Sequence, residues 1–561
     1  MGGSGAAAVL AMVVVTERVK SRRVLPQGTK AGVKSRSGQV LKGRVTFCSL
    51  FTGKRQTTRS YNKNTSSSTR LRCTTGENDP PAVGTTKVKV LSTKPTTSEN
   101  LKENRCLGSE NNNDAQPESG SHRALEESSS SSSSGEMMML LKQNRKVIVF
   151  SGGTALNSCA KQMLLSLKHQ TDEVTHVLPV SDDGGSTAEI VRVLGGPAVG
   201  DIRSRCLRLS SDKTEESRSV NALLGHRLSA HSAEEAKQEW YQVVEGDHPL
   251  WLGISEAYKN TIRAFLVHFQ QNILRRNDAR FDFTNGSIGN YFFAGARIFF
   301  RSLEAAIFLY SRVSGIPETC AVLPCVSTED RLVLGAELED GSVIRGQNEI
   351  SHPLSLASPL SAGAAQVDKN AGTQEPLESR ISRVFYLSYE GETHEHEIAM
   401  EANERVLEKL RGATCVVYGM GSLYTSLCPS LVLGGVGEGV AALGREVKKI
   451  LLLNGWHDRE IGGYDAVDCV NAVCSALNRD GSPSQGRPSR GGLGHPASTY
   501  VTHLVVPAGG HVFGGEGDRS RLGEMGIEVV EVESVDPEGR GEPRFDAKAL
   551  VEAISVILEE T

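Results

Sequence analysis

A short strand that ends in a glycine-rich loop and is followed by a helix most constrains the fold of this chain. Lys146–Phe150 is a mostly apolar run, and Ser151-Gly152-Gly153-Thr154 follows it directly. Residues 156–169 then carry apolar side chains at helical spacing, and a second apolar run ends at Val180. Strands buried on both faces read as near-continuous apolar runs. The pattern predicts an α/β fold with a Rossmann-like, doubly wound and mostly parallel sheet.

The second half of the chain continues this alternation of helices and apolar strands. A helix is predicted over residues 404–410, with strands over 414–418, 449–453 and 503–506 and a last strand over 527–532. Apolar strands that alternate with helical segments indicate further α/β units of the same sheet.

Other segments depart from this alternation. Residues 212–280 contain many helix formers, which predicts a helical cap inserted in the α/β domain. Residues 331–341 predict a β-hairpin that turns at Glu339-Asp340-Gly341. Residues 357–379 and 479–497 are rich in glycine, serine, proline and glutamine, which is typical of exposed, flexible loops.

The α/β domain is expected to span residues 145–561. Residues 1–60 contain twelve lysines and arginines but only one acidic residue, Glu17, a bias typical of organelle transit peptides. A disordered basic tail is the alternative. Residues 61–144 are polar and low in complexity, which predicts a disordered linker because too little apolar surface is available to offset chain entropy. The expected location is the chloroplast or the mitochondrion, and otherwise the cytoplasm.

Composition limits the classes of function. The formal net charge is −4, and the domain has no basic patch with interleaved aromatic residues, so no nucleic-acid binding is expected. Because no apolar run is long enough for a transmembrane helix, no membrane partner is expected either. The 11 cysteines are scattered without a C-x-x-C pair, which argues against a zinc site and a disulfide framework. They fit a reducing compartment.

The segment Ser181-Asp182-Asp183-Gly184-Gly185-Ser186 is the main candidate for a functional site. It follows a predicted buried strand, so its carboxylates and glycines lie where the strand gives way to a loop. Backbone N–H groups of such a loop can approach a phosphate, while the carboxylates can hold a hard cation such as Mg²⁺. Two alternatives stay open, namely an acid that binds a ribose hydroxyl in a dinucleotide-binding unit and a surface turn.

Three other segments suit an anionic ligand, each with an ordinary structural alternative. Ser151–Thr154 lies between a strand and a helix, where free N–H groups attract anions, although a tight turn needs the same residues. The segment Gly195–Arg205 contains Asp201 and two arginines, Arg203 and Arg205, whose guanidinium forks suit phosphate, but charged loop residues are often only solvated. Asn285–Asn290 precedes an apolar helix predicted over 291–300, where helix capping competes with ligand contact.

A second glycine loop, Gly419-Met420-Gly421-Ser422-Leu423-Tyr424-Thr425-Ser426, follows the strand predicted over 414–418. Tyr424 can stack on a nucleobase, although a buried tyrosine with a bonded hydroxyl is commoner. The next strand ends at Asn454 and is followed by a polar cluster of Trp456, His457, Asp458, Arg459 and Glu460. Polar residues at the carboxyl ends of strands mark where open α/β sheets bind ligands.

These motifs, in this order, resemble the 2-phospho-L-lactate transferase (CofD-like) family, which also contains the YvcK-type gluconeogenesis factors. The resemblance covers roughly residues 145–535 and rests on Gly152-Gly153-Thr154, Ser181 to Ser186, Gly200 to Arg203, Gly289-Asn290 and Gly421 to Ser426. Ala155 and Met420 depart from the bacterial pattern, as does Glu460-Ile461 where Glu-Thr is frequent. The insertions and the expected transit peptide indicate a eukaryotic branch, algal or plant.

The resemblance implies a Mg²⁺-dependent transferase that moves a 2-phospho-L-lactate-type group from a guanosine-diphosphate carrier to the hydroxyl of a deazaflavin. For the YvcK-like branch it implies instead a non-catalytic, nucleotide-sugar-binding regulator of carbon metabolism. A homodimer is left open. By position, Asp182 and Asp183 would be catalytic and metal-binding. The phosphate- and substrate-binding set would be Gly152, Gly153, Thr154, Ser186, Asp201, Arg203, Asn290, Gly421, Ser422, Tyr424, Thr425 and Asn454.

Overall fold

The computed structural model describes residues 145–167, 173–276, 280–352, 375–388, 396–479, 492–537 and 539–559. The transit peptide predicted over 1–60, the linker predicted over 61–144 and most of the loops predicted over 357–379 and 479–497 lie outside the described residues. Within the described part of the chain, no helix is both long and apolar enough to cross a membrane.

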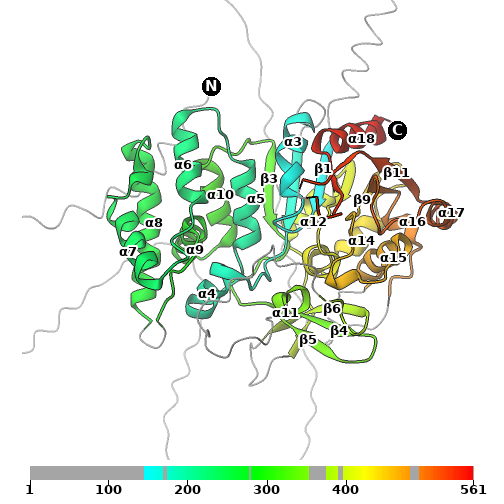
Figure 1. Cartoon of the computed structure of the whole chain (residues 1–561), viewed down its shortest axis with the longest axis horizontal. Coiled ribbons are helices and arrows are strands. Elements are labelled where there is room, and N and C mark those ends of the chain that lie inside the picture. Colours follow the sequence, from blue (N-terminus) through cyan, green and yellow to red (C-terminus); the bar gives the residue numbers. More distant parts are fainter. Residues whose placement is uncertain are drawn as a thin grey trace, which may run out of the picture. The chain divides into compact units, whose positions relative to one another are not determined.

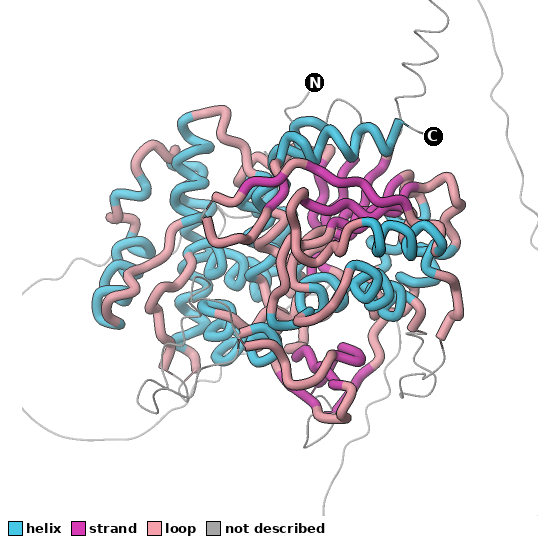
Figure 2. The backbone as a smooth tube through the Cα atoms, turned by 45° about the vertical axis from the view of Figure 1, so that its right-hand side comes forward, coloured by secondary structure: helices cyan, strands magenta, loops and turns pink. Residues whose placement is uncertain are grey.

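A seven-stranded sheet forms the centre of the α/β domain (Figures 1 and 2). Its strands are β1 (Lys146–Phe150), β2 (Glu173–Leu178), β3 (Cys320–Pro324), β8 (Cys415–Tyr418), β9 (Lys448–Leu452), β10 (His503–Pro507) and β11 (Glu528–Val532). The spatial order is β11-β10-β9-β8-β1-β2-β3, and every neighbouring pair is parallel. This is the strand order of a Rossmann sheet with one strand added at an edge. The predicted fold class is confirmed.

Helices cover both faces of this sheet because alternate strand residues point to opposite sides. Val147 and Val149 of β1 belong to the hydrophobic cluster that includes α3 (Asn157–Leu167) and α18 (Ala547–Glu559). Ile148 and Phe150 belong to the larger cluster on the other face. Burial on both faces explains why the strands read as uninterrupted apolar runs.

The helices between β2 and β3 form a body beside the β3 edge of the sheet (Figure 1). They are α4 (Gly185–Leu194), α5 (Gly200–Leu209), α6 (Glu215–Gly225), α7 (Ala233–Glu245), α8 (Glu256–Leu274), α9 (Ile288–Phe300) and α10 (Leu303–Val313). Three of them, α6 to α8, lie in the interval 212–280, where a helical cap is expected. Helix α9 contacts α4, α5, α6, α8 and α10, so it is the centre of this body. Helices α5 and α10 contact β3 and join the body to the sheet.

A small antiparallel sheet with the order β5-β4-β6-β7 precedes the second half of the main sheet in the chain. Its strands are β4 (Val333–Leu338), β5 (Val343–Arg345), β6 (Ile381–Ser388) and β7 (His396–Ile398). The hairpin predicted over 331–341 is the pair β4–β5, which leads into the short helix α11 (Gln347–Ser351). The remaining helices are α12 (Glu404–Arg411), α13 (Cys428–Leu431), α14 (Val436–Ala441), α15 (Ala466–Leu477), α16 (Ala497–Tyr500) and α17 (Glu516–Glu524).

Two boundary predictions are wrong. The strand near 527–532 is not the last, because β12 (Ser534–Val535) and β13 (Arg544–Phe545) form a further antiparallel pair. Helix α9 begins at Ile288 rather than at residue 291. Ser287 caps this helix by accepting the N–H of Asn290 (3.4 Å), which places Asn290 inside the first turn.

Gly295→Ala should destabilise the helical body. The added methyl group would overlap the carbonyl oxygen of Phe265 on α8 and lie 3.2 Å from Cβ of Phe269, so α8 and α9 would have to separate. We expect the free energy of unfolding, measured by urea denaturation, to fall by about 1–3 kcal/mol. Gly523→Ala on α17 is the matched control, because no atom lies within 4 Å of the added Cβ. An equal loss in both variants would contradict the close packing of α8 on α9.

Candidate functional site

The carboxyl ends of β1 and β8 lie side by side where the order of the sheet reverses. From β1 the chain adds β2 and β3 on one side, and from β8 it adds β9, β10 and β11 on the other. The two glycine loops follow these two strands and therefore meet. A Cβ atom on Gly152 would lie only 2.7 Å from Cβ of Ser426. Open α/β sheets bind ligands in the crevice at such a switch point.

The first glycine loop is anchored by Arg205 of α5, which is not among the predicted site residues. Its guanidinium donates to the carbonyl oxygen of Gly152 (3.0 Å) and to the hydroxyl of Ser151 (3.3 Å). It also bonds Oδ1 of Asn157 and Nδ1 of His176, each at 2.8 Å. Because Arg205 is 0% exposed, it serves the loop from inside the protein rather than meeting a ligand.

Burial sets the charge state of this anchor. Burial lowers the pKa of Arg205 to about 10, so the guanidinium is still a cation at neutral pH. Burial, and then the charge of Arg205, hold the pKa of His176 well below its usual value. A neutral His176 can accept the hydrogen bond from Arg205 through Nδ1. The loop is therefore fixed by one buried cation and neutral acceptors.

Several predicted residues gather around the first turn of α5. Gly153 lies against Asp201, whose side chain occupies the space that a Cβ atom on Gly153 would take. Arg203 is 9% exposed, and its Nε donates to Oδ1 of Asn290 (2.9 Å). Asn290 in turn donates to Oγ of Ser186 (3.0 Å). Helices α4, α5 and α9 thus bring these residues together beside the switch point of the sheet.

The neighbouring carboxylates of Asp182 and Asp183 contact different helices. Oδ1 of Asp182 accepts the N–H of Gly184 (3.0 Å), and the carboxylate lies against Gly200 at the start of α5. Oδ1 of Asp183 accepts the N–H of Asn348 (2.9 Å) in α11. Burial raises the pKa of the Asp183 carboxyl, although the hydrogen bond from Asn348 opposes this effect. The two side chains therefore have different hydrogen-bond partners, although the charge of Asp182 also raises the pKa of the Asp183 carboxyl.

This geometry limits how Mg²⁺ would be held. Within the described residues, no three histidine, cysteine, aspartate or glutamate side chains form a group suited to a metal ion. Mg²⁺ is commonly bound by one or two carboxylates, with water and substrate phosphates as its other ligands. Asp182, beside the N-terminus of α5, fits that smaller role. Asp183 fits it less well because it already binds α11.

Asn454 holds the second glycine loop in place. Its side-chain oxygen accepts the N–H of Gly421 (3.1 Å), and its amide group donates to the carbonyl oxygen of Gly421 (3.0 Å). Gly421 has a φ of 145°, a conformation that favours glycine. Asn454 was predicted to bind a ligand, but both polar atoms of its side chain form hydrogen bonds with the loop.

Tyr424 and Thr425 are buried in a π-helical turn over Leu423–Leu427. The hydroxyl of Tyr424 bonds that of Tyr464 (3.1 Å), which is the packing alternative to stacking on a base. Thr425 bonds a carboxyl oxygen of Glu460 (2.5 Å). Thr154, in contrast, is exposed in the first glycine loop, and Ser422 is half-buried in the second.

Sequence reasoning assigned no role to Asp458 or Glu460, although both stand in the polar cluster that follows the strand predicted over 449–453. The density of polar residues at a strand end was the available signal. Arg205 stood in the segment 195–205, where an arginine suits phosphate, but the structure buries it as a support for the first glycine loop. A buried arginine and a solvated one look alike in a sequence.

A cavity of about 1060 Å³ lies beside the π-helical turn, between β6 and α15. Tyr424, Tyr464, Arg380 and Asn471 contribute to its lining. Its described lining residues come neither from the first glycine loop nor from the Asp182–Asp183 segment. The cavity therefore shares Tyr424 with the second glycine loop and no described lining residue with the first.

Arg205→Lys should weaken the first glycine loop. Lysine keeps the charge but cannot reproduce the planar fork that reaches four partners. We expect the free energy of unfolding to fall by about 1–3 kcal/mol, because buried acceptors lose their donors. Arg208→Lys, an exposed position on the same helix, is the control and should change stability by less than about 0.5 kcal/mol. Urea denaturation of both variants tests the anchor, and similar values would rule it out.

Comparisons with known proteins match the part of the chain that carries these motifs. Residues 147–532 match the family model described as 2-phospho-L-lactate transferase CofD. An uncharacterized protein of Saccharomyces cerevisiae is 35% identical over 383 residues, which are 59% of this chain and 83% of that protein. The gluconeogenesis factor of Bacillus subtilis is 24% identical over 328 residues, 58% of this chain and 73% of that protein.

A putative gluconeogenesis factor of Clostridium acetobutylicum is 26% identical over 330 residues, 58% of this chain and 52% of that protein. A crystal structure of a UPF0052-family protein from Bacillus halodurans covers 73% of this chain and 99% of its own, with 20% identity and a TM-score of 0.47. The family model covers most of the α/β domain, including both glycine loops and the Asp182–Asp183 segment, and the chain therefore belongs to the 2-phospho-L-lactate transferase CofD family.

Proposed function

We propose that this protein binds a nucleotide diphosphate-linked small molecule at the switch point and transfers a phospho-linked group from it to a hydroxyl acceptor. The observation that carries the proposal is the meeting of two glycine loops and the N-terminus of α5 at one crevice. Backbone N–H groups in such loops and at a helix N-terminus favour phosphate. The family description supports 2-phospho-L-lactate as the type of group transferred.

The proposed donor is a guanosine-diphosphate carrier, and the proposed acceptor is a deazaflavin-like hydroxyl. The acceptor oxygen attacks the distal phosphorus of the diphosphate. The bond from that phosphorus to the bridging oxygen breaks, and guanosine monophosphate leaves with the bonding electrons. The acceptor proton passes to a carboxylate. Such a step needs in-line positioning and charge stabilisation more than covalent help from the protein.

The two aspartates suit different parts of this step. Asp182 would hold Mg²⁺, which when bound supplies charge stabilisation on the phosphate oxygens. Asp183 suits the proton acceptor, because burial raises the pKa of its carboxyl and a more basic carboxylate is a better base near neutral pH. Arg203, held by Asn290, would add positive charge at the same wall.

A regulator that binds a nucleotide sugar without turnover is the second candidate. It is favoured by the relatives named gluconeogenesis factor in Bacillus subtilis and putative gluconeogenesis factor in Clostridium acetobutylicum. Both candidates place the diphosphate in the same crevice, so turnover distinguishes them.

Calorimetry with guanosine diphosphate, a uridine diphosphate sugar and NAD, each with Mg²⁺, tests the ligand class. Preference for guanosine diphosphate supports the transferase, and preference for the uridine diphosphate sugar supports the regulator. Binding of NAD alone would overturn both. Mass spectrometry of a deazaflavin incubated with the lactyl diphosphate donor then tests transfer directly.

Asp182→Asn and Asp183→Asn should separate the two roles. In a transfer assay we expect Asp183→Asn to lower kcat by about 10²–10⁴, the usual contribution of a general base. The wild-type rate should rise with pH above the ordinary range of aspartate, because the base must lose its proton. Asp182→Asn should instead weaken the response to Mg²⁺. Asp330→Asn, at an exposed turn, is the control. Wild-type kinetics in Asp183→Asn would refute its role as base.

A further inference from the structure

A buried glutamate joins the second glycine loop to the rest of the site. Glu460 is 2% exposed. Its Oε2 accepts the N–H groups of Tyr424 (2.8 Å) and Thr425 (3.1 Å). Its Oε1 bonds the hydroxyls of Thr425 (2.5 Å) and Ser351 (2.9 Å). One carboxyl group thus connects the π-helical turn that ends the glycine loop to the last residue of α11.

Asp458 lies beside Glu460 and holds the same segment. Its Oδ1 accepts the N–H groups of Glu460 (3.0 Å) and Ile461 (3.2 Å). The hydroxyl of Ser422, in the glycine loop itself, interacts with the Asp458 carboxyl and lowers its pKa, against the larger effect of burial. The two carboxyl groups therefore contact the loop at Ser422 and again at the turn that follows.

The charge of Asp458 adds to the cost of ionising Glu460. Burial, and then the charge of Asp458, raise the pKa of Glu460 to about 7. Burial raises the pKa of Asp458 as well. Burial and a nearby like charge both disfavour the ionised form, so Glu460 retains its proton to about neutral pH.

The other titratable groups around the pair do not remove this effect. His352, after α11, lies near enough to lower the pKa of Asp458. The thiols of Cys428 on α13 and Cys469 on α15 face the pair, but burial raises their pKa, so they stay neutral. The guanidinium of Arg459 donates instead to the carbonyl oxygens of Ile350 (3.1 Å) and Glu375 (2.8 Å).

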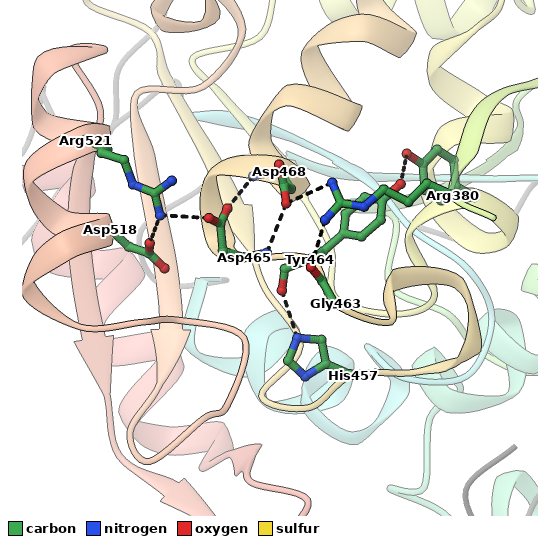
Figure 3. Close-up of polar contacts among 9 residues, drawn as sticks. Arg380, His457, Gly463, Tyr464, Asp465, Asp468, Asp518 and Arg521 are labelled. Atoms are coloured by element: carbon green, nitrogen blue, oxygen red, sulfur yellow. Dashed lines mark hydrogen bonds and ion pairs between the residues drawn. The ribbon is translucent and has the colours of Figure 1, made fainter. Parts of the chain in front are cut away.

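The segment that carries the pair is braced from two directions (Figure 3). Arg380 donates to the carbonyl oxygen of Gly463 (2.8 Å) and pairs with Asp468 (3.2 Å). Arg521 of α17 pairs with Asp465 (2.7 Å) from the other side. Both contacts hold this segment in place. A change of charge at Glu460 is therefore expected to alter the hydrogen bonds of Glu460 rather than to move the segment.

We infer that Asp458 and Glu460 are positioning residues for the second glycine loop, and that the charge of this buried pair acts on the bound anion from behind the loop. The inference rests on the proposed function only in taking an anionic ligand to occupy that loop. The four hydrogen bonds of Glu460 survive in either state. When Glu460 is ionised, Oε1 accepts from the two hydroxyls, and when it is protonated, Oε1 donates to one of them.

The charge, in contrast, changes with pH. Loss of the proton from Glu460 adds a negative charge next to the second glycine loop, where we propose that phosphate binds. The affinity for an anionic ligand therefore falls as pH rises through about 7. The free energy of unfolding depends on pH in the same direction as the affinity. The pKa of Glu460 is raised above its usual value of 4.5, so its contribution to stability is present below that pH and is lost as pH rises to about 7.

The test uses the full chain and guanosine diphosphate with Mg²⁺ as the probe. Affinity is measured by calorimetry from pH 6 to 8 for the wild type, Glu460→Gln and the exposed control Glu524→Gln. The control retains any pH dependence that belongs to the nucleotide. Between pH 6 and pH 8, we expect the affinity of the wild type and of the control to fall by about tenfold more than the affinity of Glu460→Gln. A tenfold difference corresponds to a shift of one unit in the pKa of Glu460 when the ligand binds. Equal pH profiles in all three proteins overturn the inference.

A second measurement does not depend on the nucleotide. Infrared spectroscopy should show the carbonyl band of a buried, protonated carboxyl group in the wild type, lost as pH rises through about 7 and absent in Glu460→Gln. Thr425→Val removes one donor to Oε1 and should move the midpoint of this band to higher pH. No titrating band in the wild type overturns the inference, even if Glu460→Gln fails to fold. If the band titrates but the nucleotide does not bind, the proposed function is refuted, whereas the protonation of Glu460 near neutral pH is established.

Discussion

The parallel pairing of β1 with β8 is the constraint on which the site depends. It joins Val147 to Cys415 and Phe150 to Tyr418, segments separated by most of the domain. Only this register brings the two glycine loops into contact at Gly152 and Ser426. Each loop then has its own internal support, Arg205 for the first and Asn454 for the second. The crevice is thus a property of the strand order, refined by side chains that need not touch a ligand.

The fold was predictable because strands that are buried on both faces appear in the sequence as continuous apolar runs, as at Lys146–Phe150. The neighbourhood of Gly153, Asp201, Arg203, Asn290 and Ser186 was predictable as a set, since each follows a strand or starts a helix. The direction of side chains was not. Asp182 and Asp183 are adjacent in sequence, yet one contacts α5 and the other α11. That divergence depends on where α11 lies, which no local pattern records.

Buried polar groups account for the residues whose supporting role the sequence did not reveal. Arg205, Asp458 and Glu460 are each surrounded by partners from distant segments, and burial shifts the pKa of each. A charged residue in a sequence is ordinarily expected at the surface. Here the supporting layer behind both glycine loops is ionic, cationic behind the first and acidic behind the second. The switch point therefore lies between a buried cation and a buried acidic pair.

Helix α11 has a consequence for how this family can vary. Its Asn348 binds Asp183, and its Ser351, three residues later and on the same helix face, binds Glu460. One inserted or deleted residue between them would rotate Ser351 by about 100° and break one of the two links. The number of residues in this turn is therefore more constrained than the identity of those residues. Among relatives, insertions and deletions should accumulate on either side of residues 348–351 and be excluded from the turn itself.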